Sequence, residues 1–162
     1  MRRLILAIVL SFPVATLDLQ AAPRPGQNFG DWQVACERTK QGGQLCHIFQ
    51  KLTLKKSGKL VLHVAVGHSL KGKPFALFVA PLGIALRPGV QLKVGGGKPH
   101  RMPVQVCTPR GCQASLALDK ALIRELKRAN TATFTFVRPD GKAFNVSISL
   151  KGFTKGFDSL RR

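Results

Sequence analysis

The sequence is poor in acidic side chains and contains no tyrosine. Seven Asp and Glu oppose 26 Lys and Arg, so the formal net charge is +19 at pH 7. Such an excess favours polyanionic partners such as nucleic acid, anionic lipid, lipopolysaccharide or acidic polysaccharide. A solvated basic surface without a dedicated ligand has the same composition, so charge alone assigns no partner.

The usual signatures of catalysis and metal binding are also missing. The chain has no Cys-x-x-Cys pair, no Gly-x-Ser-x-Gly elbow and no His-x-x-x-His spacing. Of the few acids, Asp119 resembles a helix cap and Asp140 a turn residue, and nothing marks two others as an acid/base pair. His63 alternates with apolar residues, which indicates a packed or surface strand histidine. We therefore predict a non-enzymatic protein with no catalytic residue, no cofactor-binding residue and no metal site.

Three observations argue against nucleic acid as the partner. The chain contains neither an RNP-type aromatic pattern nor paired zinc ligands. Phe134 and Phe136 alternate into one strand face, as core residues do. Export, indicated by the N-terminus, would also separate the protein from intracellular nucleic acid.

The N-terminus has the pattern of a secretory signal peptide. Met1, Arg2 and Arg3 form a basic start, residues 4–17 are mostly apolar, and Ala21 and Ala22 suit cleavage. The apolar run is too short for a membrane span of about 20 residues. We predict removal of residues 1–22, a flexible leader over residues 23–28, one domain over residues 29–160, and no transmembrane span after cleavage.

The four cysteines of an exported chain predict two disulfides. Four cysteines allow three pairings, and the sequence alone excludes none of them. We favour Cys36 with Cys46 and Cys107 with Cys112, because both pairs are local and flank turn-rich segments. In the second pair, Thr108-Pro109-Arg110-Gly111 forms the turn.

Short apolar segments separated by turns predict an all-β domain, either a β-sandwich or an open barrel. The clearest hairpin alternates apolar and polar residues on both sides of Arg138-Pro139-Asp140-Gly141, a type I turn pattern. The expected strands cover residues 29–37, 45–54, 59–66, 75–80, 90–94, 104–108, 113–118, 131–136 and 144–150. Residues 82–86 continue the apolar pattern, and residues 95–99 are expected to be a flexible loop.

One amphipathic helix is expected near residues 119–129, and a short C-terminal helix after residue 152. Asp119 would cap the first helix, and Leu122 and Leu126 would face the core. Its basic residues fall on the opposite face and form a candidate polyanion contact; they are Lys120, Arg124, Lys127 and Arg128. An ordinary solvated helix face is the alternative.

A set of short segments resembles the invasion-associated locus B family of exported alphaproteobacterial envelope proteins. The most specific are Gly30-Asp31-Trp32 with Cys36, Gly111-Cys112-Gln113-Ala114, and Leu150-Lys151-Gly152-Phe153. The resemblance covers about residues 28–160. It implies a periplasmic or outer-membrane-associated β protein, linked in some pathogenic members to host-cell invasion and virulence. It supplies no catalytic residues.

Together these patterns predict a non-enzymatic envelope protein that contacts an anionic envelope or host component through a basic surface. The partner would be anionic lipid, lipopolysaccharide or an envelope protein. The alternative is a secreted soluble protein that binds a polyanion, either a glycan or nucleic acid. Retention in the envelope would favour the first hypothesis, and release into the medium the second.

Overall fold

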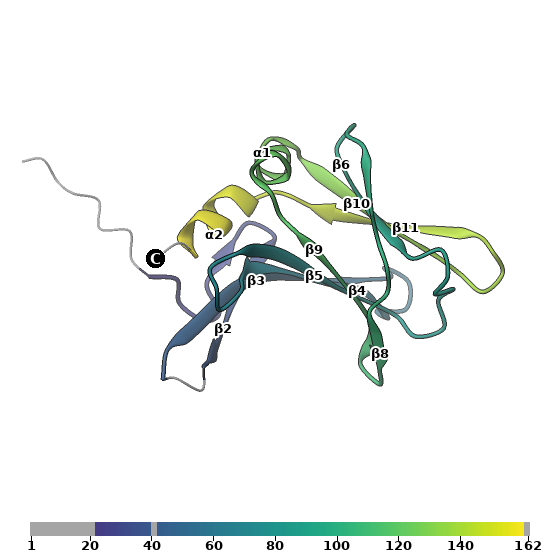
Figure 1. Cartoon of the computed structure of the whole chain (residues 1–162), viewed down its shortest axis with the longest axis horizontal. Helices are drawn as coiled ribbons and strands as arrows, with labels where there is room; N and C mark the ends of the chain where they lie inside the picture. The colour runs from purple at the N-terminus through teal and green to yellow at the C-terminus, as the bar shows by residue number, and fades with distance from the viewer. Residues whose placement is uncertain (1–21, 40–41, 161–162) are drawn as a thin grey trace, which may run out of the picture.

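Two antiparallel sheets pack face to face in the computed structural model, which describes residues 22–39 and 42–160 (Figure 1). The predicted signal peptide lies outside the described residues except for Ala22. Seven strands in the order β1-β2-β3-β4-β5-β9-β8 form the first sheet, and four in the order β11-β10-β6-β7 form the second. The predicted all-β class is confirmed, as a sandwich rather than a barrel.

The strand bounds agree closely with the sequence pattern. The first sheet comprises β1 (Asn28–Phe29), β2 (Trp32–Arg38), β3 (Gln44–Thr53), β4 (Leu60–His68), β5 (Pro74–Ala80), β8 (Val106–Thr108) and β9 (Gly111–Ala117). The second comprises β6 (Val90–Val94), β7 (Pro99–Met102), β10 (Thr131–Val137) and β11 (Ala143–Ser149). The helices are α1 (Lys120–Arg128) and α2 (Phe153–Ser159), both as predicted.

Two local expectations were wrong. The expected strand over residues 29–37 is interrupted at Gly30, where the chain turns with a φ of +57° between β1 and β2. Pro99 begins strand β7, although residues 95–99 were expected to be a loop. The segment around β7 does not alternate clearly, but it pairs with β6 at the sheet edge, where Met102 is buried.

Alternating side chains from the two sheets fill the core. Phe78 of the first sheet stacks on Phe134 of the second, with ring centroids 5.0 Å apart. Trp32 packs edge-on against Phe153 of α2 at 5.4 Å, and each of these side chains is no more than 1% exposed. The tertiary fold therefore depends on contacts between the two sheets, and between β2 and α2, as well as on pairing within each hairpin.

Both favoured disulfides are present, and each joins residues that lie directly opposite each other in a strand pair. Cys36 of β2 opposes Cys46 of β3, and Cys107 of β8 opposes Cys112 of β9. Each bond therefore ties the two strands of a hairpin together close to its turn. The described residues include no free cysteine.

The segments near the two ends of the domain meet across a junction of backbone atoms. The Asp31 amide donates to the Lys151 carbonyl oxygen at 3.1 Å, and Trp32 Nε1 donates to the Ser149 carbonyl oxygen at 3.0 Å. Gly30 and Gly152 both have positive φ at this point, where their missing side chains leave room for the opposite backbone. Close approach of the two chains thus explains both glycines.

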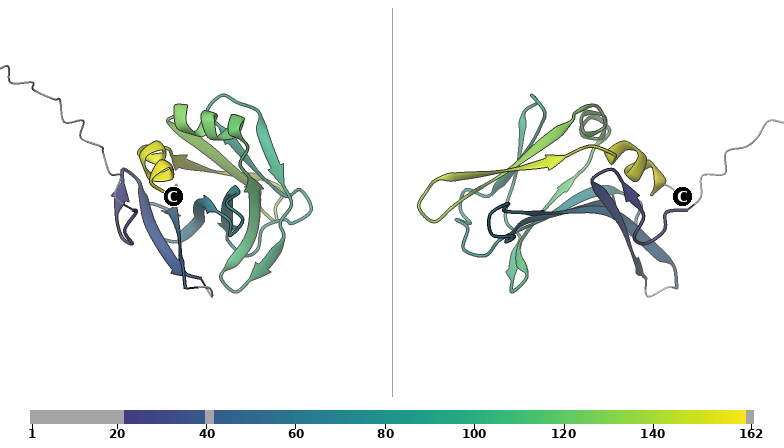
Figure 2. Two further views of the ribbon diagram at one scale, coloured as in Figure 1. Left: turned by 60° about the vertical axis from the view of Figure 1, so that its left-hand side comes forward. Right: turned by 180° about the vertical axis from the view of Figure 1, so that it is seen from behind.

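Part of the predicted leader is hydrogen-bonded to the first sheet. The Gly26 amide donates to the Val34 carbonyl oxygen at 2.9 Å, and the Val34 amide donates to the Gln27 carbonyl oxygen at 2.8 Å. Figure 2 shows this N-terminal segment beside α2, which places both ends of the described chain at one end of the sandwich.

Candidate anion-binding surface

Helix α1 lies across one edge of the core and exposes its basic side. The Asp119 carboxylate accepts a hydrogen bond from the Leu122 amide at 2.7 Å, which caps the first turn as predicted. Leu122 and Leu126 are 3% and 5% exposed and hold the helix against the core. Because these two anchors share one face, Arg124 is turned towards solvent on the other.

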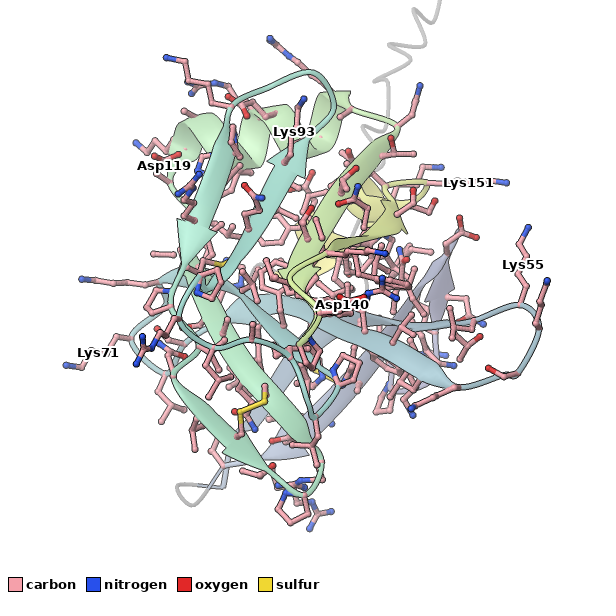
Figure 3. The ribbon with its side chains drawn as sticks, turned by 90° about the vertical axis from the view of Figure 1, so that its right-hand side faces the viewer. Lys55, Lys71, Lys93, Asp119, Asp140 and Lys151 are labelled. Carbon is pink, nitrogen blue, oxygen red and sulfur yellow. A yellow bond between two sulfur atoms is a disulfide. The ribbon has the colours of Figure 1, made fainter. Side chains whose placement is uncertain are left out.

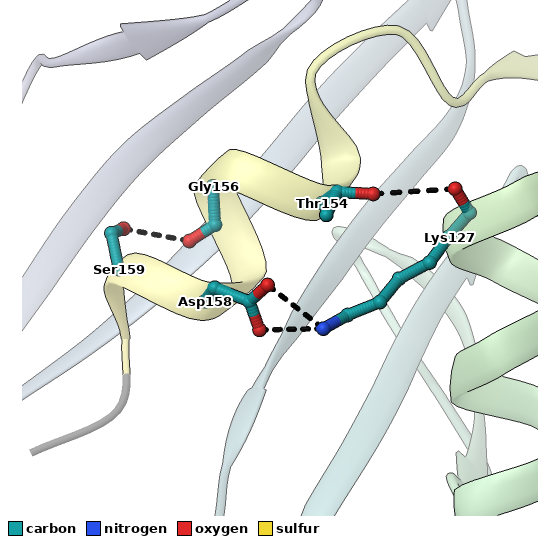
Figure 4. Close-up of polar contacts among 5 residues, drawn as sticks. All are labelled: Lys127, Thr154, Gly156, Asp158 and Ser159. Atoms are coloured by element: carbon teal, nitrogen blue, oxygen red, sulfur yellow. Dashed lines mark hydrogen bonds and ion pairs between the residues drawn. The ribbon is translucent and has the colours of Figure 1, made fainter.

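The structure separates the four candidate basic residues of α1 into two groups. Lys120, Arg124 and Arg128 are exposed, whereas Lys127 is partly buried. Lys127 Nζ lies 2.6 and 2.8 Å from the two carboxylate oxygens of Asp158 on α2 (Figure 4).

Two further contacts hold Lys127 against α2. Its Nζ lies 5.9 Å from the centre of the Phe157 ring, and its carbonyl oxygen accepts a hydrogen bond from Thr154 Oγ1 at 3.3 Å. Lys127 therefore joins the two helices. Sequence reasoning could not identify this role, because Asp158 is 31 residues away along the chain.

The three exposed cations recur every four residues, so their side chains line one side of the helix. Their mutual repulsion is unfavourable, by roughly 0.2–0.5 kcal/mol per pair at this spacing. A bound anion would relieve that repulsion. We call Lys120, Arg124 and Arg128 the α1 basic row.

The hairpin β6–β7 lies beside α1 and adds positive charge. A side-chain carbon placed on Gly97, in the hairpin turn, would lie 3.4 Å from Glu125 Oε2 of α1. Lys93 and Lys98 of this hairpin are exposed, and Figure 3 shows Lys93 extending outward near the helix. The hairpin thus widens the basic region around the α1 basic row.

Two histidines on the outer face of the first sheet have altered acidity. Desolvation lowers the pKa of His47, and the nearby Glu37 carboxylate partly opposes this effect. Desolvation also lowers the pKa of His63, and the positive charges of Lys51 and His47 lower it further. His63 Nε2 is buried without a hydrogen-bond partner, and the ring packs edge-on against Phe49 at 5.5 Å. Both histidines therefore favour their neutral form in the folded protein.

An open depression of 540 Å³ lies between the β2–β3 and β4–β5 hairpins, lined by residues that include Gln44, Cys46, His68 and Leu160. Its lining contains no carboxylate, and His68 stacks on Phe157 at 5.3 Å. Within residues 22–39 and 42–160, no three His, Cys, Asp or Glu side chains gather as a metal site would require. No helix in the described part of the chain is long and apolar enough to cross a membrane.

Comparison with known proteins identifies similar sequences and folds. Residues 32–161 match the family model of the invasion associated locus B protein. Among solved structures, invasion associated protein B from Bartonella henselae superposes with a TM-score of 0.72 at 22% identity, covering 83% of this chain and 92% of that one. A comparison with curated proteins found no match. At this identity, the structural likeness supports the fold.

Proposed function

The chain belongs to the invasion associated locus B family, and from this premise we propose that it is a non-enzymatic envelope protein that binds an anionic component through the α1 basic row. Residues 1–22 would be removed on export, and residues 29–160 would act in the periplasm or at the outer membrane. Both disulfides suit this location, because such bonds persist in oxidising compartments.

One observation carries the proposal: three cations stand exposed on one side of α1, while the fourth is paired with Asp158. The α1 basic row has no carboxylate partner among the described ion pairs, which are Lys127–Asp158 and Arg138–Asp140. Each cation close to an anionic lipid surface contributes about 1 kcal/mol. The row could therefore supply about 3 kcal/mol towards binding at low ionic strength.

The test is sedimentation of the oxidised mature protein with lipopolysaccharide-containing vesicles over a salt series. The variant K120Q/R124Q/R128Q should bind at least tenfold more weakly than the unsubstituted protein, since the row is expected to contribute about 3 kcal/mol. A matched control, K55Q/K56Q/K59Q, removes the same charge from the exposed β3–β4 turn and should bind much more tightly than the α1 variant.

Equal weakening of the two variants would refute the assignment to α1 and indicate generic charge attraction. Heparin serves as the competitor, because it distinguishes a specific envelope component from polyanions in general. Binding that moves fully to heparin would favour a soluble polyanion-binding protein, whereas binding that persists at physiological salt with heparin present supports an envelope role.

A further inference from the structure

The outward face of the first sheet carries a band of half-buried apolar side chains, flanked by polar ones, and no other element packs on it among the described residues. Strand register places its side chains in three rows across the sheet. The rows are Ala35–His47–Gly67–Phe75–Ala117, Gln33–Phe49–Ala65–Leu77–Ser115 and Lys51–His63–Val79–Gln113–Val106. Lys51 is the one lysine or arginine in these rows, and its Nζ lies 5.8 Å from the centre of the Phe49 ring. We call the central part, Phe49, Ala65, Phe75, Leu77 and Val79, the apolar floor.

The second sheet shows what a solvated face of this protein looks like. Its outward side chains are polar, and they include Gln91, Lys93, Thr133, Thr135, Asn145 and Ser147. An antiparallel sheet with one face in water normally alternates in this way. The apolar floor departs from the rule, and its residues do not belong to the core cluster. A contiguous apolar patch on a soluble protein indicates an interaction surface.

Cations occupy the turns at both strand ends of the apolar floor. Arg38, Lys71 and Lys73 lie at one end, and Lys55, Lys56, Lys59 and Arg110 lie at the other; all are exposed. Figure 3 shows Lys55 and Lys71 extending from separate turns of this sheet. The acids between residues 28 and 117 are Asp31 and Glu37 alone. The surface is therefore complementary to an apolar partner surface with acidic ends.

The shape of the sheet favours an elongated partner over a flat one. The ends of the β2–β3 and β8–β9 hairpins both extend away from the second sheet, on either side of the apolar floor (Figures 1 and 2). Two copies of this face would therefore meet first at their projecting hairpins, which carry like charge. Seven residues of β5 span about 23 Å, at about 3.3 Å per residue. A helix of about 15 residues has that length, and its diameter of about 10 Å matches about two strand spacings.

We propose that the apolar floor binds an acidic amphipathic helix of a partner protein, laid along β3, β4 and β5. The helix would place its apolar side chains against Phe49, Leu77 and Val79, as in other complexes of a helix with an apolar surface. Its carboxylates would reach the cationic turns at both ends. This surface is on the opposite side of the molecule from α1, so it is separate from the proposed anion-binding function.

The test uses a labelled 15-residue model peptide with leucine on one helical face and glutamate on the other, in 150 mM salt. Its control is a peptide of the same composition in scrambled order, which has the same charge but no apolar face. The unsubstituted protein should bind the amphipathic peptide at least about tenfold more tightly than the scrambled peptide. Equal binding of the two peptides would overturn the proposal, because only charge would then matter.

Substitutions locate the binding surface. Leu77→Lys adds positive charge to the apolar floor and should still weaken binding about tenfold. Thr133→Lys makes the same addition on the outer face of the second sheet and should leave binding unchanged. Val79→Lys provides a second floor variant, and Trp32 fluorescence checks that each variant is folded. Equal binding by Leu77→Lys and Thr133→Lys would refute the proposal.

Three further outcomes separate the possible occupants. The K120Q/R124Q/R128Q variant should bind the peptide normally, whatever its effect on vesicle binding. A protein that sediments as a dimer and becomes monomeric on Leu77→Lys would show that a second copy covers the floor, contrary to the proposal. Vesicle binding that is lost in Leu77→Lys, without peptide binding by the unsubstituted protein, would identify a lipid surface instead and would also overturn it.

Discussion

At the junction between the two ends of the domain, adding a single methyl group should lower the free energy of unfolding by an unusually large amount. A Cβ atom added at Gly152 would lie 2.0 Å from the Phe29 carbonyl oxygen and 2.4 Å from its carbonyl carbon. Both are backbone atoms, so no side-chain rotation relieves the overlap. The φ of +86° at Gly152 also disfavours an L-residue. We therefore expect Gly152→Ala to push the two chains apart.

The size of the effect follows from the contacts at the junction. The left-handed conformation costs alanine roughly 1–2 kcal/mol. Separation would also weaken the hydrogen bonds from the Asp31 amide and from Trp32 Nε1, at roughly 1 kcal/mol each. The expected loss in the free energy of unfolding is about 3–4 kcal/mol, out of the roughly 5–15 kcal/mol typical of a domain. For a chain of this size, that lowers the Tm by about 10 °C.

Gly141 provides the matched control. Its φ is +79°, but a Cβ atom there would have nothing within 4 Å. Gly141→Ala should therefore cost only the conformational part, roughly 1–2 kcal/mol. Thermal and urea unfolding under oxidising conditions, followed by Trp32 fluorescence, measures both variants. Trp32 is the one tryptophan and is 1% exposed beside the junction.

Equal destabilisation by Gly152→Ala and Gly141→Ala would refute the close-packing explanation and leave backbone conformation as the whole effect. Gly30→Ala repeats the test from the other chain, because its Cβ atom would lie 2.5 Å from the Lys151 carbonyl oxygen. It should lower the free energy of unfolding about as much as Gly152→Ala does. A loss no larger than that of Gly141→Ala would contradict the close packing proposed at the junction.

Two further measurements test the roles assigned to individual side chains. Burial lowers the pKa of His47 and His63 in the folded state, so the unfolded chain binds protons more readily. The free energy of unfolding should therefore be fully maintained above pH about 6.5 and should decrease as the pH falls below it. Urea titrations at several pH values should show a flatter pH dependence for the H47Q/H63Q variant. An unchanged pH profile in that variant would show that other groups cause it. Lys127→Met should lower stability by no more than about 1 kcal/mol and leave vesicle binding intact, because the ion pair with Asp158 is partly exposed and holds α2 rather than a ligand. If Lys127→Met instead weakened vesicle binding as much as K120Q/R124Q/R128Q, Lys127 would have to contribute directly to binding.

Local sequence patterns were sufficient for most of the secondary structure. Alternation with period two identified β6, β10 and β11, because one face of each strand is buried and the other faces solvent. The cap and the apolar spacing identified α1, and the turn between Cys107 and Cys112 indicated their disulfide. Each of these features depends on residues that are close together in the chain.

Tertiary structure decided what local patterns could not. Strand β7 is defined by its pairing with β6, and Lys127 pairs with an aspartate that only the fold brings within 2.6 Å. The continuous apolar run of β5 could not show which residues enter the core; one face packs between the sheets, whereas Phe75, Leu77 and Val79 are half-buried on the outer face. Periodicity shows which residues share a face, whereas the packing of the two sheets determines what, if anything, covers that face.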